Sequence, residues 1–312
     1  MRTNPYCHSR ESGNPANQPV DWIPDSRQGG RNDKYGNDNR ILNNKNMSIP
    51  LVLKVKEVID EAPGTKSYVF HHNLHAKPGQ FVMTWLPGTD EVPMSIGWQD
   101  DHSFTLTIAD AGDCTHDINE RIKVGDPLGI RGPYGTSFKY DEYQNIFLVG
   151  GGVGTPPMLS LAQFARKKEI NVEVFLGGRT KDHLLFEKQF KELGCTVHTA
   201  TDDGSKGHHG YVTDVLEMEL EKRSANVDCV YTCGPEIMMV KVAQMAQDFN
   251  IKSQVSMERY MKCGFGICGQ CCMDGSGIRL CKEGPVLEGE RALQHEEFGK
   301  YKRDSAGVRE NI

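Results

Sequence analysis

Four cysteines near the C-terminal end of the chain have the spacing of ligands to a metal centre. They are Cys263, Cys268, Cys271 and Cys281. The pattern is C-x4-C-x2-C, and nine residues separate the third cysteine from the fourth. Thiolates at this spacing are typical of plant-type [2Fe–2S] clusters, which take three sulfurs from one tight loop. Gly264, Gly266 and Gly269 provide the backbone freedom that such a loop requires.

Zinc and disulfide bonds are the alternatives for these cysteines. Structural zinc sites usually consist of two separated C-x2-C pairs, whereas only Cys268 and Cys271 form such a pair here. Disulfides are typical of secreted proteins, and nothing in the sequence marks this chain as secreted. Cys272 also lies in the loop, and we interpret it as a neighbour of the ligands, with an exchange of roles as the alternative.

Length and composition favour a protein of two or three domains that acts outside the membrane. The chain has 312 residues and a formal net charge of −6, which gives no reason to expect a nucleic acid as partner. No run approaches the ~18 consecutive apolar residues of a membrane span. We therefore expect a cytoplasmic protein.

The first 46 residues predict no folded element. They are rich in Asn, Gly, Pro, Arg and Ser and show neither helical nor strand periodicity. They also lack the apolar run of a signal peptide. We interpret residues 1–47 as a disordered or wrongly assigned extension and expect Met47 to be the true first residue.

Residues 48–140 have the pattern of a small antiparallel β barrel. Apolar and polar residues alternate over residues 51–60, 67–72, 80–86 and 103–110. Pro/Gly turns such as Ala62-Pro63-Gly64 separate these segments. Short strands at such intervals favour a barrel.

Residues 141–250 instead predict an α/β domain with a mostly parallel sheet. Apolar strands over residues 145–150, 172–178, 195–201 and 228–234 alternate with helical segments. The helices are expected at residues 158–168, 182–193, 211–222 and 235–249. The cysteine loop follows as a small module at 251–285, and residues 286–312 read as a polar tail.

The turn over residues 150–157 is a candidate phosphate-binding loop. A glycine turn from a strand into a helix brings backbone N–H groups close to an anion, which the helix dipole also favours. Gly152 and Gly154 match the first part of G-x-G-x-x-G, but Pro157 occupies the third glycine position. Thr155 is expected to cap the helix and Pro156 to suit its first turn. A purely structural turn is the alternative.

Three further segments are weaker candidates. Cys233-Gly234-Pro235 ends a predicted strand, where parallel sheets bind ligands, although Gly-Pro also simply terminates strands. In the barrel, residues 93–96 and 112–115 place small polar groups near turns, which ordinary turn chemistry also explains.

In this order, the motifs resemble the ferredoxin–NADP reductase superfamily over about residues 48–250. The resemblance implies a flavin-binding barrel joined to a nicotinamide-binding α/β domain. Residues 93–96 resemble the family's flavin motif and residues 112–115 its flavin pyrophosphate element. Residues 150–157 and 233–235 resemble its nicotinamide elements. The cofactor-binding residues implied are Pro93, Met94, Ser95, Ile96, Gly112, Thr115, Gly150, Gly152, Gly154, Thr155, Pro156, Cys233, Gly234 and Pro235.

One position departs from the family's flavin motif. A basic residue is common before Pro93, and this chain has Val92 there. The missing guanidinium would remove a bidentate phosphate contact. Lys66, His71, His72 and Arg131 are the candidates to replace it.

With its C-terminal cluster motif, the chain is similar to the electron-transfer subunits of NAD-dependent (class 1B) dihydroorotate dehydrogenases. This resemblance implies FAD, a [2Fe–2S] cluster and NAD(H) as cofactors. It implies a hetero-oligomer, in the family a heterotetramer, with an FMN-containing catalytic subunit that converts dihydroorotate to orotate in pyrimidine biosynthesis. The alternatives are a flavin/iron–sulfur subunit of a sulfhydrogenase or sulfite reductase, and a zinc-stabilised nucleotide-binding module without a redox role.

Overall fold

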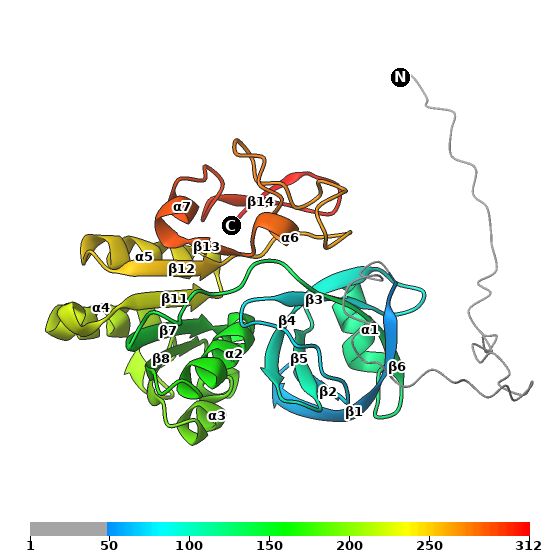
Figure 1. Cartoon of the computed structure of the whole chain (residues 1–312), viewed down its shortest axis with the longest axis horizontal. Coiled ribbons are helices and arrows are strands. Elements are labelled where there is room, and N and C mark those ends of the chain that lie inside the picture. Colours follow the sequence, from blue (N-terminus) through cyan, green and yellow to red (C-terminus); the bar gives the residue numbers. More distant parts are fainter. Residues whose placement is uncertain (1–48) are drawn as a thin grey trace, which may run out of the picture. The chain divides into compact units, whose positions relative to one another are not determined.

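The computed structural model describes residues 49–312, so the extension expected over residues 1–47, including Met47, lies outside the described part. The first described part is a closed barrel, as the alternating pattern predicts (Figure 1). Its strands are β1 (Leu51–Ala62), β2 (Thr65–Phe70), β3 (Phe81–Trp85), β4 (Glu91–Gln99), β5 (Phe104–Ala109) and β6 (Pro127–Tyr134). They pair antiparallel in the order β1-β2-β5-β4-β3-β6, which leaves no free edge.

Aromatic and aliphatic side chains fill the barrel. Tyr68, Phe70 and Phe104 are fully buried, and the rings of Phe70 and Phe104 stack with centroids 5.0 Å apart. Helix α1 (Asp113–Arg121) joins β5 to β6 and contributes Ile118 to the same core. The alternation that predicted the strands therefore separates core-facing from outward-facing residues.

The second part is a seven-stranded sheet with helices on both faces. Its strands are β7 (Asn145–Gly151), β8 (Asn171–Gly178), β9 (Thr196–Thr201), β10 (His208–His209), β11 (Cys229–Cys233), β12 (Lys252–Ser256) and β13 (Val286–Glu288). They lie in the order β10-β9-β8-β7-β11-β12-β13, and only β13 runs antiparallel to its neighbour. This confirms the predicted mostly parallel sheet.

Alternate residues of the strands pack against different helices. Leu148 of β7 belongs to one core with α2 (Thr155–Arg166) and α3 (Glu187–Glu192). Its neighbour Val149 belongs to another core with α4 (Val212–Arg223) and α5 (Glu236–Asp248). The four helices overlap the four predicted segments. Three short 3-10 helices complete the domain: η1 (Gly152–Gly154), η2 (Lys181–His183) and η3 (Ser224–Asn226).

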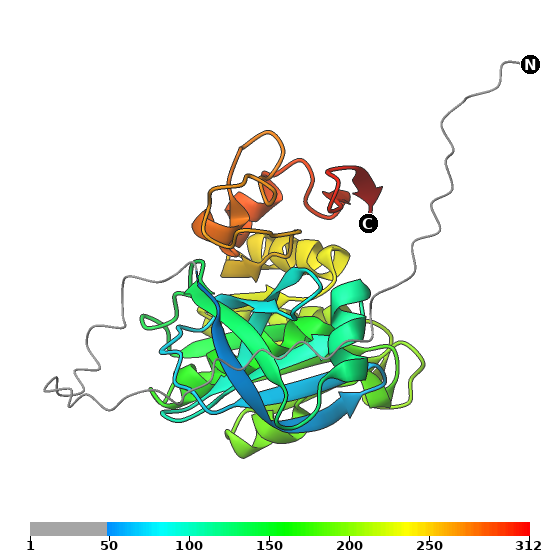
Figure 2. The same ribbon diagram turned by 90° about the vertical axis from the view of Figure 1, so that its right-hand side faces the viewer.

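The C-terminal residues differ from the polar tail expected at 286–312. β12 and β13 extend the parallel sheet on either side of the cysteine loop in sequence. The segment also contains α7 (Gly289–Leu293), β14 (Tyr301–Arg303) and β15 (Arg309–Asn311), while α6 (Leu280–Glu283) closes the cysteine loop. In Figure 2 this region lies over α5 and β12.

The reason for the difference is that the charges of this segment are paired inside the protein. Arg259 is 8% exposed, and its Nε donates to Glu297 Oε1 at 2.6 Å. The same guanidinium bonds to Glu236 at the start of α5. From composition alone, charged groups are expected to lie in solvent. Here Arg259 pairs with Glu236 and Glu297 inside the protein and so joins α5 to the segment after the cysteine loop.

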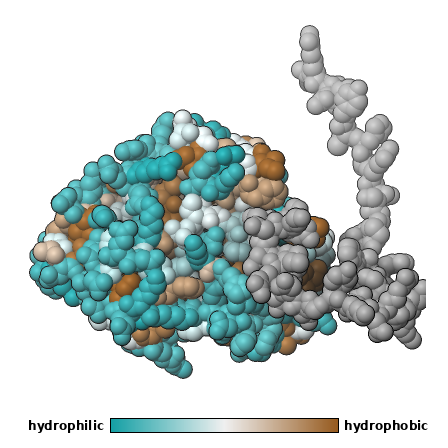
Figure 3. Space-filling view, in the orientation of Figure 1, coloured by the Kyte–Doolittle hydropathy of each residue, from teal (hydrophilic) through white to brown (hydrophobic). Residues whose placement is uncertain are grey.

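The surface of the described residues is mostly polar. The face in Figure 3 is hydrophilic, with apolar side chains in small separate groups. Ile267 in the cysteine loop is the most exposed of the large apolar side chains in residues 49–312, at 78%. None of the helices in this part of the chain has the length and apolar character needed to cross a membrane.

Candidate functional site

Two turns meet at the carboxyl edge of the parallel sheet. Gly150 on β7 lies opposite Cys233 on β11. A Cβ added to Gly154 would lie 2.3 Å from the Gly234 nitrogen and 2.4 Å from the Cys233 carbonyl oxygen. Only glycine fits there, because such distances are far inside van der Waals contact. The structure therefore brings together the two segments that the sequence marked as nicotinamide elements.

The glycine turn leads into α2, but Thr155 does not cap it. Thr155 is the first helical residue and is 1% exposed, while Gly154 occupies the cap position without a side-chain hydrogen bond. Pro156 lies in the first turn, as predicted. The cap prediction was wrong because the helix begins one residue earlier than a threonine cap requires. A helix start without a side-chain acceptor suits an anionic ligand.

The predicted flavin motif lies on β4 beside the same helix. A Cβ on Gly97 would lie 3.2 Å from Cβ of Pro156, and Gln163 Nε2 of α2 donates to the Gln99 carbonyl oxygen at 2.7 Å. Pro93, Met94 and Ser95 are half-buried on β4. Ile96 differs, because it is 2% exposed and its side chain belongs to the barrel core. Only its backbone is therefore placed to meet a cofactor.

The hydroxyl of Thr115 is already engaged. It accepts hydrogen bonds from the Ala111 and Gly112 amides, both at 3.0 Å, and donates to the Gly112 carbonyl oxygen at 2.9 Å. This turn fixes the start of α1. Thr115 is 8% exposed, so its role in the described structure is to shape the turn at Gly112.

Two of the four basic candidates for the flavin phosphate have other partners. Lys66 Nζ donates to the Asn119 carbonyl oxygen at 2.7 Å. Arg131 is 7% exposed and forms a two-bond ion pair with Glu91. His71 is exposed, and burial lowers the pKa of half-buried His72. His71 and His72 therefore remain as candidates for the flavin phosphate, since the bonds of Lys66 and Arg131 do not involve them.

The four predicted cluster ligands are gathered as two thiol pairs. The Cys263 thiol interacts with Cys268, and the Cys271 thiol with Cys281. Backbone amides also point at the sulfurs: Ile267 N lies 3.4 Å from Cys263 Sγ. Similarly, Cys281 N lies 3.3 Å from Cys271 Sγ.

The hydrogen bonds favour the thiolate form at two of the four cysteines. Burial opposes ionisation of Cys263, but backbone amides, that of Cys268 foremost, outweigh it and lower the pKa to about 6. The hydrogen bond with Cys281 is the main cause that lowers the pKa of Cys271 to about 7. Thiolate is the form that binds a metal, and these two cysteines are shifted toward it, whereas the hydrogen bond with Cys271 and burial raise the pKa of Cys281.

The donor set of the loop, four thiols, is the one that an iron–sulfur cluster takes. Within residues 49–312, no three His, Cys, Asp or Glu side chains converge as ligands of one ion. Cys272 belongs to neither pair, and burial raises the pKa of its thiol.

The cysteine loop lies directly against the barrel, which the sequence did not indicate. A Cβ on Gly264 would lie 2.8 Å from Met83 Cγ and 3.1 Å from the Tyr134 ring. Arg131 Nη1 donates to the Cys263 carbonyl oxygen at 3.1 Å. In the sequence, Gly264 between Cys263 and Phe265 indicates that space is limited there. It does not indicate which part of the protein makes the contact.

Glu258 is a residue to which the sequence motifs assign no role. It precedes the cysteine loop and faces Cys233, whose pKa it helps to raise. Burial raises the pKa of Glu258 itself, and the charge of Glu236 adds to the shift. The Glu258 residue is nevertheless exposed to solvent, so it lies at the surface beside the buried Cys233.

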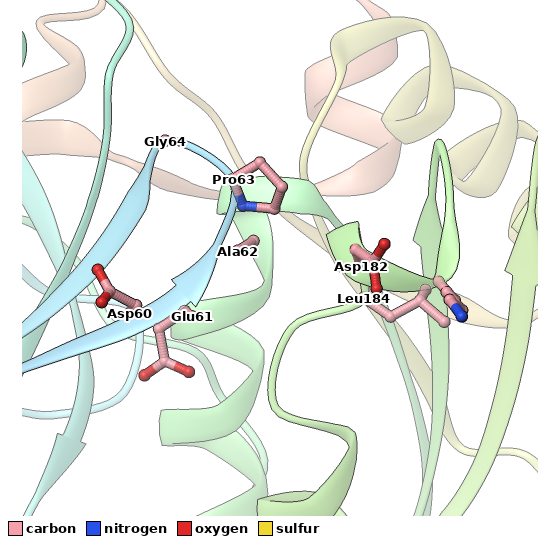
Figure 4. Close-up of a pocket in the computed structure, with 8 residues that line it drawn as sticks. Asp60, Glu61, Ala62, Pro63, Gly64, Asp182 and Leu184 are labelled. Atoms are coloured by element: carbon pink, nitrogen blue, oxygen red, sulfur yellow. The ribbon is translucent and has the colours of Figure 1, made fainter.

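A separate recess of about 650 Å³ lies between the β1–β2 turn and the segment around η2 (Figure 4). Its lining includes Glu61, Pro63 and Asp182. Burial raises the pKa of Glu61. None of the predicted site residues lines it, so this recess is distinct from the meeting point of β4, α2 and β11.

Comparison with known proteins supports the arrangement. A family described as the oxidoreductase NAD-binding domain matches residues 148–244. The iron–sulfur cluster binding domain of dihydroorotate dehydrogenase B matches residues 258–292. The probable dihydroorotate dehydrogenase B (NAD(+)) electron transfer subunit of Methanocaldococcus jannaschii is 44% identical over 261 residues, covering 84% of this chain and 98% of the relative. The chain belongs to this family. The corresponding protein of Methanocella arvoryzae is 41% identical over 268 residues. That alignment covers 84% of this chain and 99% of the relative.

Solved structures of other proteins share the fold of this electron-transfer subunit. A structure of an NADH-dependent reduced ferredoxin-NADP oxidoreductase aligns with a TM-score of 0.70 and 29% identity, covering 77% of this chain and 89% of that one. The flavohaem-like FAD/NAD-binding domain of a Vibrio cholerae nitric oxide dioxygenase aligns with a TM-score of 0.57 and 19% identity, covering 65% and 94%. The predicted family and fold class are confirmed. The chain is an electron-transfer subunit of an NAD-dependent oxidoreductase, with an NAD-binding domain and an iron–sulfur domain.

Proposed function

We propose that this electron-transfer subunit carries FAD on its barrel and a [2Fe–2S] cluster in its cysteine loop. It would pass electrons between NAD(H) and an FMN-containing dihydroorotate dehydrogenase subunit. The domains proposed are FAD-binding over residues 48–140, NAD-binding over 141–250 and cluster-binding over 251–285. The observation that carries the proposal is that the glycine turn and the cysteine loop both contact the same barrel, through β4 and β3–β6 respectively.

In this proposal the protein mainly holds and orients its cofactors. Gly152, Gly154 and the first turn of α2 would hold the NAD(H) pyrophosphate with backbone N–H groups. Cys233 and Glu258 would border the nicotinamide, and Ser95 with the β4 backbone would border the flavin. FAD, when bound, accepts a hydride and releases its two electrons singly. Cys263, Cys268, Cys271 and Cys281 would hold the group that receives them.

The partner would dock over the exposed side of the cysteine loop. Cys268 is exposed and Ile267 beside it is 78% exposed, so one ligand and one apolar side chain face outward together. A hetero-oligomer would cover both and exclude water from the path of the electrons. We infer that the orotate chemistry of pyrimidine biosynthesis takes place in that partner.

Cofactor analysis of the full-length protein, purified without oxygen, tests the proposal. We expect one flavin and about two iron and two acid-labile sulfide per chain, as a [2Fe–2S] cluster requires. A colourless protein that contains zinc would reject the redox function and favour a zinc-stabilised nucleotide-binding module. Pull-down with the FMN subunit then tests the partner separately.

A further inference from the structure

Arg131 is the one arginine of the barrel strands, and it connects the barrel to the first cluster ligand. Its Nη1 donates to the Cys263 carbonyl oxygen at 3.1 Å and to the Tyr134 hydroxyl at 3.3 Å. Its Nε donates to Glu91 Oε1 at 2.8 Å. The guanidinium carbon lies 5.8 Å from the ring centroid of Phe265, the second residue after Cys263. These contacts fix the guanidinium between β4, β6 and the loop.

The charges of this connection are shielded from solvent. The side chain of Arg131 is 6% exposed and that of Glu91 is 21% exposed. Charges in such surroundings act more strongly on a neighbouring redox centre than charges in water do. Hydrogen bonds, net charge and solvent exposure around the ligands set the potential of an iron–sulfur cluster.

We propose that the Glu91–Arg131 pair is a positioning and potential-setting unit for the cluster. The inference rests on the proposed function, because it requires a cluster in the loop. Arg131 holds the Cys263 end of the loop on the barrel through its fork of N–H groups. Its positive charge stabilises the reduced, more negative cluster, and Glu91 moderates that charge.

Redox titration of full-length, cluster-loaded variants, followed by electron paramagnetic resonance, tests the electrostatic part. Arg131→Gln should lower the midpoint potential, because it removes a positive charge. Glu91→Gln should raise it, because it leaves that charge uncompensated. A purely structural role would not give shifts of opposite sign. Equal signs, or no shift in either variant, would overturn the proposal.

Arg279 provides a matched control. Its Nη1 also donates to a loop carbonyl oxygen, that of Gly266, at 2.9 Å. However, its side chain is 37% exposed and that of its partner Glu283 is 38% exposed. Arg279→Gln should therefore shift the potential less than Arg131→Gln does, since solvent screens the charge. An equal shift would contradict the role assigned to burial.

Arg131→Lys separates position from charge and serves if Arg131→Gln does not fold. Lysine keeps the charge but lacks the planar fork. We expect a potential near that of the unchanged protein, with cluster loss to a chelator roughly tenfold faster. Chelator resistance equal to that of the unchanged protein would refute the positioning role. If the unchanged protein itself holds no cluster, the proposed function fails instead.

Discussion

At the scale of single residues, the difference between Cys268 and Cys272 is the sharpest claim about the cluster. Both cysteines lie in one loop, but only Cys268 belongs to a thiol pair. Cys268→Ser should lose most of the iron–sulfur absorbance, because it removes a ligand. Cys272→Ser makes the same chemical change beside the site and should retain the absorbance. Iron content and the visible spectrum measure both, and a full cluster in Cys268→Ser would reject the ligand assignment.

Gly154 gives a prediction about the contact between the two turns. An alanine methyl there would meet the backbone of Cys233 and Gly234 at 2.3–2.4 Å. Gly154→Ala should lower the free energy of unfolding by roughly 1–3 kcal/mol, the usual cost of overpacking. Chemical denaturation measures it.

Gly112→Ala is the control for this substitution. Gly112 has an extended backbone with φ of −177° and nothing within 4 Å of an added Cβ. The free energy of unfolding of the Gly112→Ala protein should differ from that of the unchanged protein by no more than about 0.5 kcal/mol. If Gly154→Ala were equally harmless, the close contact between the turns would be wrong.

At the scale of elements, the buried Glu236–Arg259–Glu297 group holds the C-terminal segment to α5. Glu297 accepts from Arg259 and, through its other oxygen, from the Asp274 amide at 2.8 Å. Glu297→Gln should cost about 1.5–3 kcal/mol of unfolding free energy, the value of hydrogen bonds to a charged group.

The control for this element is Glu290→Gln on α7. It makes the same change at an exposed position and should stay within about 0.5 kcal/mol of the unchanged protein. Thermal and urea denaturation of both variants measure the difference. Similar stability for the two would mean that the buried charges do not hold the segment in place.

The elements also show how far the sequence could predict the fold. Period-2 alternation in β1, β2, β3 and β5 and the strand–helix order from β7 to α5 depend on local patterns, and these predictions were confirmed, whereas β4 and β6 were not predicted. The C-terminal segment was misjudged because pairing of Arg259 with Glu236 and Glu297 links residues far apart in sequence. Composition reports the charge of such residues but not its partner.

The same limit applies to the candidate site. Spacing predicted the cysteine loop, and in the structure the Cys263 thiol interacts with Cys268 and the Cys271 thiol with Cys281. The roles of Arg131 and Glu258 depend on contacts between the barrel, the sheet and the loop, which no local motif encodes. Thr155 was misassigned as a cap because the sequence places a helix start only to within a residue or two. The exact first residue depends on how the helix packs.

At the scale of the whole molecule, the barrel lies between the two ends of the proposed electron path. β4 contacts the start of α2, and β3 and β6 contact the cysteine loop. β3 pairs with both β4 and β6, so these contacts come from neighbouring strands. The arrangement supports a flavin on the barrel that exchanges electrons with NAD(H) on one side and the cluster on the other.

Anaerobic titration of the full-length protein with NADH, followed by visible absorption, tests this account most directly. The account predicts that flavin and iron–sulfur bands both bleach, because electrons that enter at the glycine turn reach the cysteine loop through the barrel. Bleaching of the flavin alone, in a protein shown to contain its cluster, would contradict the proposed path. So would a cluster that NADH reduces in the absence of flavin.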